Sequence, residues 1–206
     1  MTLHMHHVYR VAIADLRPTQ LTVGYREVAA KRAAWDAMTK PARKQFLDGH
    51  VVPVVMGPSQ RRYVVDHHHL ARALADDGQD TILVGQLADF SVLAKPEFWL
   101  VMQHRRWVYP FDGNGERQPF DALPKVIAQL VDDPWCSLAG ALRDAGGYAK
   151  ENGPFPEFLW ADFLRRRLDH ALLASDFSAA VAAALNLAHA AVAAHLPGWS
   201  AARAKP

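Results

Sequence analysis

The stretch YVVDHHHLARAL, residues 63–74, decides the fold of this 206-residue chain. Its first residues are aromatic and β-branched, and we predict a strand over Arg61 to Val65. From His67 to Ala75 the apolar residues recur at helical spacing, so a strand passes directly into a helix. Asp66 lies at the junction, where a carboxylate can cap the helix by accepting its unpaired N–H groups. We therefore expect an α/β unit built around this junction.

Strand and helix patterns continue on both sides of the junction. Further strands are predicted at residues 8–17, 50–56 and 81–87, and a helical segment at 24–48 is interrupted or restarted at Pro41. The order over residues 8–87 is therefore strand, helix, strand, strand, helix, strand. This order predicts a small mixed sheet with helices, an α/β (α+β) fold.

The second half of the chain has a different composition. Residues 97–109 are rich in aromatic side chains, and the pattern from Leu123 onward is mostly helical. We expect an α/β unit over residues 8–94 and an aromatic-rich helical extension over 95–200. Because the first unit is small for an independent core, the extension is expected to pack on it in one continuous fold.

Composition and charge limit the class of protein. Half of the residues are apolar, and 23 Lys and Arg against 21 Asp and Glu leave a net charge of +2 with His neutral. Strong nucleic-acid binding is not expected, because sequence-independent affinity needs many uncompensated phosphate contacts. The single cysteine, Cys136, excludes an internal disulfide framework. No long apolar stretch is free of polar residues, so no membrane partner is expected and the expected location is cytoplasmic. The patterns indicate no oligomeric state.

The histidines at 67–69 are the densest chemical signal. Three successive side chains on a helix point about 100° apart, so they cannot all bind one metal ion. His68 and His69 are nonetheless expected to reach over the same strand end, beside helix N–H groups that suit an anion. Asp66, His68 and His69 are therefore the predicted catalytic residues, for proton transfer or ligand binding. The alternative is structural, with Asp66 a simple cap and the histidines partly exposed.

Three segments, in order, resemble a known family. Leu16 to Gln20 (LRPTQ) resembles the opening strand and Pro-x-Gln turn of the ParB-like domain, a fold shared with sulfiredoxin and a free-serine kinase. Val52 to Val55 (VPVV) resembles its Pro-Ile-Val strand, and Tyr63 to Ala73 resembles its phosphate-binding box. The span from Leu16 to Arg166 resembles more closely a subgroup labelled ParB-like nucleases. Its members join a Thr-Gln-x-x-Val-Gly opening and an Asp-His-His-His box to an aromatic and helical second half.

The chain departs from the wider family inside the box. His67 stands where the family has a Gly that lets a phosphate approach the backbone, and Leu70 replaces an Arg, while Arg72 remains as the second basic residue. The box contains no cysteine, which excludes sulfiredoxin activity. Gln20 stands where the kinase has the glutamate that acts as its catalytic base. Kinase activity is therefore not expected unless Glu27 takes that role.

The leading hypothesis is a cytoplasmic enzyme that binds a small phosphorylated or otherwise anionic ligand at the start of the Asp66–Leu74 helix. The resemblance implies phosphoester hydrolysis, nuclease-like by the family label. Two alternatives stay open: a nucleotide-binding regulatory module without turnover, and an enzyme that uses a divalent metal ion. The expected ligand-binding residues are Gln20, His67, Arg72, His104 and Arg105, and a metal would be held by Asp66, His68, His69 and His50.

Overall fold

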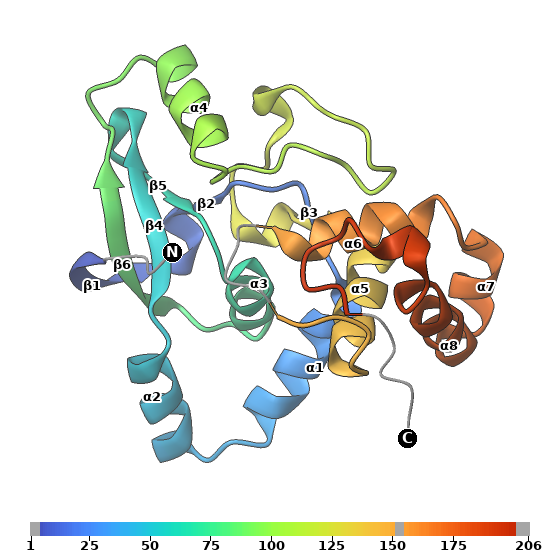
Figure 1. The fold of residues 1–206 in the computed structure, drawn as a ribbon. Helices are drawn as coiled ribbons and strands as arrows, with labels where there is room; N and C mark the ends of the chain where they lie inside the picture. Colours follow the sequence, from blue (N-terminus) through green and yellow to red (C-terminus); the bar gives the residue numbers. More distant parts are fainter. Residues whose placement is uncertain (1–4, 151–154, 201–206) are drawn as a thin grey trace. The chain divides into compact units, whose positions relative to one another are not determined.

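The computed structural model describes residues 5–150 and 155–200 (Figure 1). The chain divides between Asp132 and Asp133 into two compact units, which we call the N-terminal and the C-terminal unit. The sheet and its helices belong to the N-terminal unit, and the C-terminal unit is helical. The structure therefore confirms a mixed α/β fold.

A five-stranded mixed sheet forms the centre of the N-terminal unit, in the order β1-β6-β4-β5-β2. The strands are β1 (His6–Ala12), β2 (Leu16–Pro18), β4 (Val52–Gly57), β5 (Arg61–Val64) and β6 (Thr81–Asp89). β1 is antiparallel to β6, β6 is parallel to β4, β4 is antiparallel to β5, and β5 is parallel to β2. Two short strands, β3 (Thr22–Val23) and β7 (Val131–Asp132), form a separate parallel pair.

The two faces of this sheet contact different cores, because side chains alternate along a strand. Val54 and Val64 are partners across β4 and β5, and both belong to a buried cluster that includes Leu74. The next pair, Val55 and Tyr63, belongs to a second cluster on the other side. The β-branched residues of the central strands thus serve both cores at once.

Helices cover both faces of the sheet (Figure 1). The first core takes apolar residues from α1 (Tyr25–Asp36), α2 (Lys40–Gly49) and α3 (His68–Asp76), and the second from α4 (Lys95–His104). Thr39 caps α2, its hydroxyl accepting from the Ala42 N–H at 3.4 Å, and Pro41 lies in the first turn, where its missing N–H costs nothing. The predicted restart of the helix near Pro41 is confirmed.

The single strand predicted over residues 8–17 is wrong. β1 ends at Ala12, a 3₁₀ turn follows over Ile13–Asp15, and β2 then lies at the opposite edge of the sheet. The alternating pattern continues through the turn because Ile13 is also buried, its N–H donating to the Asp80 carbonyl at 2.9 Å. Periodicity alone therefore could not reveal that the chain changes edge here.

The segment over residues 95–132 belongs to the N-terminal unit, so the division falls later than the expected boundary near residue 95. The physical reason is aromatic packing. Phe98 and Trp99 of α4 contact Tyr63 of β5, with ring centroids 4.7 and 5.3 Å away, and Trp107 completes the same cluster. One face of the sheet would be uncovered without this segment.

The C-terminal unit is helical in its described part. Its α-helices there are α5 (Pro134–Asp144), α6 (Pro156–Arg165), α7 (His170–Ser175) and α8 (Phe177–Ala188), with α5 packed against α6 and α8. Asp133, Asp169 and Asp176 cap α5, α7 and α8 through their carboxylates. None of the helices in the described ranges is long and apolar enough to cross a membrane.

Candidate functional site

The chain turns from β5 into α3 through a residue with left-handed backbone angles, and no side chain of the described residues caps the helix. His67 is the N-cap residue and has left-handed backbone angles, φ 67° and ψ 27°. Asp66 lies one position earlier, and its carboxylate accepts the N–H of His67 at 2.6 Å. The predicted capping of α3 by Asp66 is therefore wrong, because the left-handed residue separates the carboxylate from the first turn. Gly adopts positive φ without strain, whereas His67 has a side chain in this conformation.

His68 is a buried and neutral residue that holds the preceding loop. Its side chain is 3% exposed, and its Nε2 accepts the Thr19 N–H at 3.2 Å. Burial lowers the pKa of His68 to about 3, an effect to which His69 and His67 add and which the Val64 backbone opposes. The ring is therefore neutral at neutral pH, with Nε2 an acceptor and its single N–H on Nδ1. The Thr19 hydroxyl donates to the Val64 carbonyl at 2.7 Å, which joins the end of β2 to the end of β5.

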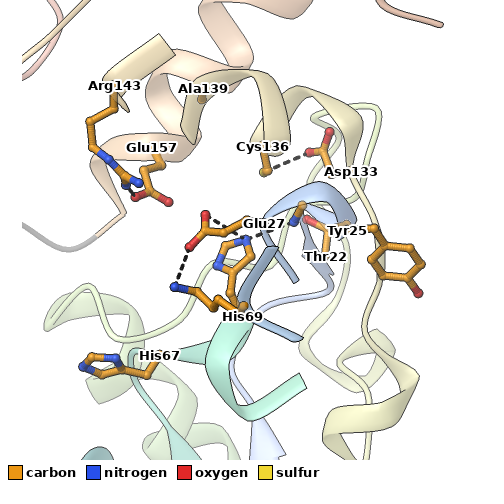
Figure 2. A network of polar contacts seen from close by, with 12 residues as sticks. Thr22, Tyr25, Glu27, His67, His69, Asp133, Cys136, Ala139, Arg143 and Glu157 are labelled. Atoms are coloured by element: carbon orange, nitrogen blue, oxygen red, sulfur yellow. Dashed lines mark hydrogen bonds and ion pairs between the residues drawn. The ribbon is translucent and has the colours of Figure 1, made fainter. Parts of the chain in front are cut away.

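The side chain of His69, in the first turn of α3, contacts the start of α1. Its Nε2 accepts the Gly24 N–H at 3.0 Å and lies 3.8 Å from a carboxylate oxygen of Glu27. Figure 2 shows Glu27 and His69 side by side, with His67 pointing away from them. Glu27 also contacts Lys31, four residues later in α1, at 3.2 Å. Because Nε2 accepts a hydrogen bond, the proton of the neutral ring lies on Nδ1.

Arg72 is held by its own unit. Its Nε donates to Asp76 at 2.8 Å, Nη1 donates to the Leu130 carbonyl, and the guanidinium lies 5.0 Å from the centre of the Tyr25 ring. These contacts tie α3 to the segment that carries β7 and to the first residue of α1. Arg72 lies one turn after His68, and its contacts hold α3 in place.

The remaining predicted ligand residues lie in several places. Gln20 is buried, and its amide donates to the Thr22 carbonyl at 2.6 Å. His104 and Arg105, at the end of α4, are exposed, with the Arg105 guanidinium 5.0 Å from the Trp107 ring centre. His50, after α2, stacks on Phe46 at 3.8 Å, and its Nδ1 lies 2.7 Å from the Phe46 carbonyl.

The structure thus gathers some predicted residues and leaves others apart. Asp66 and His67 are exposed at the start of α3, with His68 and His69 in its first turn. Within the described residues of the N-terminal unit, no three of the four predicted metal ligands offer atoms close enough to share one ion. Thr19 and Gly24 hold two of the histidines, and sequence reasoning gave neither a role. The signal was present, since both belong to the Thr-Gln-x-x-Val-Gly segment.

An exposed helix start with a carboxylate and a histidine beside it can bind an anion and move a proton. The first N–H groups of a helix have no intrahelical acceptor, and the helix dipole favours negative charge there. His69, with Glu27 as a negative neighbour, is the group best placed for proton transfer. The start of α3 thus lies at the end of β5, an inner strand between β4 and β2 that leads through Asp-His-His-His into the helix. A mixed sheet with this strand-to-helix junction is the arrangement that the sequence resemblance to ParB-like domains predicted.

Comparison with known proteins identifies the family. The family model described as "Putative ParB-like nuclease" matches residues 9–166, and the chain belongs to this family, as the sequence predicted. The crystal structure of protein Atu1540 from Agrobacterium tumefaciens is similar, with 51% sequence identity and a TM-score of 0.90 over 96% of this chain and 98% of that chain. A search of curated proteins gives no match.

Proposed function

We propose that this protein is a cytoplasmic phosphoester hydrolase that binds a small phosphorylated ligand at the N-terminus of α3. The observation that carries the proposal is the exposed Asp66–His67 start of α3, one residue away from the half-buried His69–Glu27 pair. The family label is consistent with phosphoester chemistry, but a fold does not determine a reaction. The cytoplasmic part of the proposal is the expectation from the sequence, and the one cysteine, Cys136, is buried.

Ligand binding rests on the helix start. A phosphate there would meet the first-turn N–H groups and the positive end of the helix dipole, which together stabilise an anion by up to about 2 kcal/mol in a partly buried geometry. His67 is exposed beside these groups and adds positive charge when it is protonated. Asp66 is the acidic group nearest to them along the chain, and it orients the ligand or accepts a proton.

Proton transfer rests on His69. The Gly24 N–H orients the neutral ring through Nε2. Protonation of Nε2 requires this hydrogen bond to be given up, and Nε2 would then face the Glu27 carboxylate, which stabilises the imidazolium. In this proposal His68 and Arg72 are positioning residues, because the first is neutral and buried and the second is held by Asp76 and Leu130. A positioning residue acts by holding the Thr19 loop and α3 in place.

The test is hydrolysis of bis(p-nitrophenyl) phosphate and p-nitrophenyl phosphate by the full chain, with and without EDTA or added Mn²⁺. We expect turnover to fall at least 100-fold in His69→Ala and Asp66→Asn, with thermal midpoints close to that of the wild type. His189→Ala is the matched control, because His189 is exposed after α8 in the other unit.

Binding separates this proposal from its alternative. The neutral state of His68 leaves fewer titrating groups, which favours a module that binds a nucleotide without turnover. Calorimetry with ATP, CTP and GTP tests it. Nucleotide binding that Asp66→Asn removes, without any phosphoesterase activity, would establish the regulatory module and overturn the hydrolase. Full activity in both variants would overturn the site itself.

A further inference from the structure

A second concave feature lies at the other end of β2 and β5. These strands are parallel, so their carboxyl ends lead together to Thr19 and Asp66, while their amino ends lie together on the opposite side. There the structure has a pocket of about 410 Å³, formed by the turn before β2, the start of β5 and the segment around Lys125. The pocket is thus separate from the start of α3.

The charged lining of this pocket is strongly unbalanced. Arg17, Arg61, Arg62 and Lys125 line it together with one acid, Asp15. Among the described residues, the side chains of Arg17, Arg61 and Lys125 make no ion pair. A lining with an excess of positive charge attracts an anion, and a bound anion would neutralise part of this excess.

Local contacts fix some of these cations in place. Arg62 donates its Nε to the Tyr9 hydroxyl at 3.3 Å, and its guanidinium lies 5.7 Å from the centre of the Tyr9 ring. Ser59 and Gln60, just before β5, both have left-handed backbone angles, with φ 59° and 56°. Such angles are strained for residues other than Gly, and here they complete the tight turn that delivers Arg61 to the pocket.

We propose that this pocket binds a compact anion with two or more phosphate groups, of the class of pyrophosphate and short polyphosphates. Arg17 and Arg61 offer planar pairs of donors that match phosphate oxygens, and Arg62 adds charge while its Nε is held by Tyr9. The lining contains no aromatic ring on which a base could stack, so charge and not a nucleobase decides the ligand. This is a second site, and it does not depend on the reaction proposed for the start of α3.

The test is isothermal calorimetry of the full chain with pyrophosphate and with orthophosphate at physiological salt. We expect pyrophosphate to bind at least tenfold more tightly than orthophosphate. Arg17→Gln and Arg61→Gln should each weaken pyrophosphate binding at least tenfold, whereas Asp15→Asn should strengthen it several-fold. Lys40→Gln is the matched control, because Lys40 is an exposed cation of α2 outside the pocket lining.

Each other outcome contradicts the proposal. Absence of pyrophosphate binding, or equal binding in Arg61→Gln and wild type at equal thermal midpoints, overturns it. Binding that Asp66→Asn removes and Arg61→Gln leaves intact would place the anion at the start of α3 instead. A short duplex DNA that binds through Arg17 and Arg61 where pyrophosphate does not would replace the small ligand with a nucleic-acid backbone.

Discussion

The imidazole of His68 couples folding to pH. Its pKa is lowered to about 3 in the folded chain, chiefly by burial, against an ordinary value of 6.5 in the unfolded chain. Between these values the unfolded chain binds the proton and the folded chain does not, so stability is lost as pH falls below about 6.5. We expect this residue to remove about 1.4 kcal/mol of unfolding free energy per pH unit in that window.

Urea unfolding of wild type and His68→Gln at pH 7.5, 6.0 and 5.0 measures this effect. The glutamine carbonyl can still accept the Thr19 N–H but cannot bind a proton, so the variant should lose the slope that His68 causes. The comparison uses the slope of the unfolding free energy against pH in each protein. The difference between the two slopes isolates the titration of His68, whatever the absolute stability of the variant at pH 7.5. Parallel curves for the two proteins would show that His68 is not the source.

The left-handed backbone at His67 predicts an unusual order of stabilities. Gly tolerates φ 67° without strain, whereas a β-branched residue does not. His67→Gly should raise the free energy of unfolding by about 0.5–1 kcal/mol, after allowance for the freedom that Gly adds to the unfolded chain. His67→Val should lower it by about 1 kcal/mol or more. Chemical denaturation checks this order, and Val as stable as Gly would contradict the conformation.

At the scale of elements, the hairpin from β4 to β5 packs so closely on α4 that one glycine is required. A Cβ at Gly57 would lie 2.6 Å from a ring carbon of Tyr63 and 2.8 Å from one of Phe98. We expect Gly57→Ala to lower the free energy of unfolding by about 1–3 kcal/mol, because the rings must shift to make room.

Gly49→Ala provides the control for this substitution. Gly49 ends α2, and a Cβ there meets no other atom within 4 Å. Its replacement should be neutral or stabilising by up to about 1 kcal/mol, since Ala favours the helix. Equal losses at Gly49 and Gly57 in thermal or urea unfolding would show that packing against Tyr63 and Phe98 is not the cause.

Patterns of one element at a time were predictable, and the partners of those elements were not. The β5–α3 junction and the helix restart at Pro41 follow from local spacing and are present. The strand predicted over residues 81–87 is also present and extends to Asp89. The change of edge after Ala12 and the packing of α4 on the sheet depend on contacts between residues far apart in sequence. No period in the sequence encodes such contacts.

The same limit applies to the candidate site. The sequence identified His68 and His69 as neighbours over a strand end, but it could not tell which ring is buried. That depends on the N–H groups of Thr19 and Gly24, which donate to His68 and His69 and lie 49 and 45 residues away in sequence. No sequence pattern pairs these residues with the rings. The catalytic and ligand-binding roles of the predicted residues stay predictions until the substitutions above are measured.

For the whole molecule, the charge distribution predicts weak binding to nucleic acid. Within the densest basic run, Arg165 to Arg167, two of the side chains contact residues of the C-terminal unit. Arg165 lies 2.7 Å from the Asp133 carboxylate and also contacts Asp162, and the Arg167 guanidinium covers the Phe163 ring at 4.1 Å. With 23 Lys and Arg against 21 Asp and Glu, the chain as a whole has little excess positive charge to replace the counter-ions of a duplex.

We therefore expect a mixed-sequence duplex DNA to bind no more tightly than about 10⁻⁴–10⁻⁶ M at physiological salt. Fluorescence anisotropy with a labelled duplex at several salt concentrations measures this affinity. Sub-micromolar binding with a steep salt dependence, removed by replacing Arg166 and Arg167 with Ala, would contradict the prediction and assign the C-terminal unit to DNA.

The strand order also governs how the chain can fold while it is being made. In the described sheet β1 is an edge strand whose hydrogen-bonded neighbour is β6, and β6 also separates β1 from β4. On a ribosome, the segment between Ala12 and Thr81 takes roughly 3 to 14 s to synthesise, and throughout that time β1 has no partner. Within this sheet, β1 leaves the exit tunnel before the other strands and is nevertheless among the last to pair. A nascent chain arrested before Thr81 emerges cannot complete the sheet. Its β1 backbone then lacks the hydrogen-bond partners that β6 provides and is accessible to chaperones.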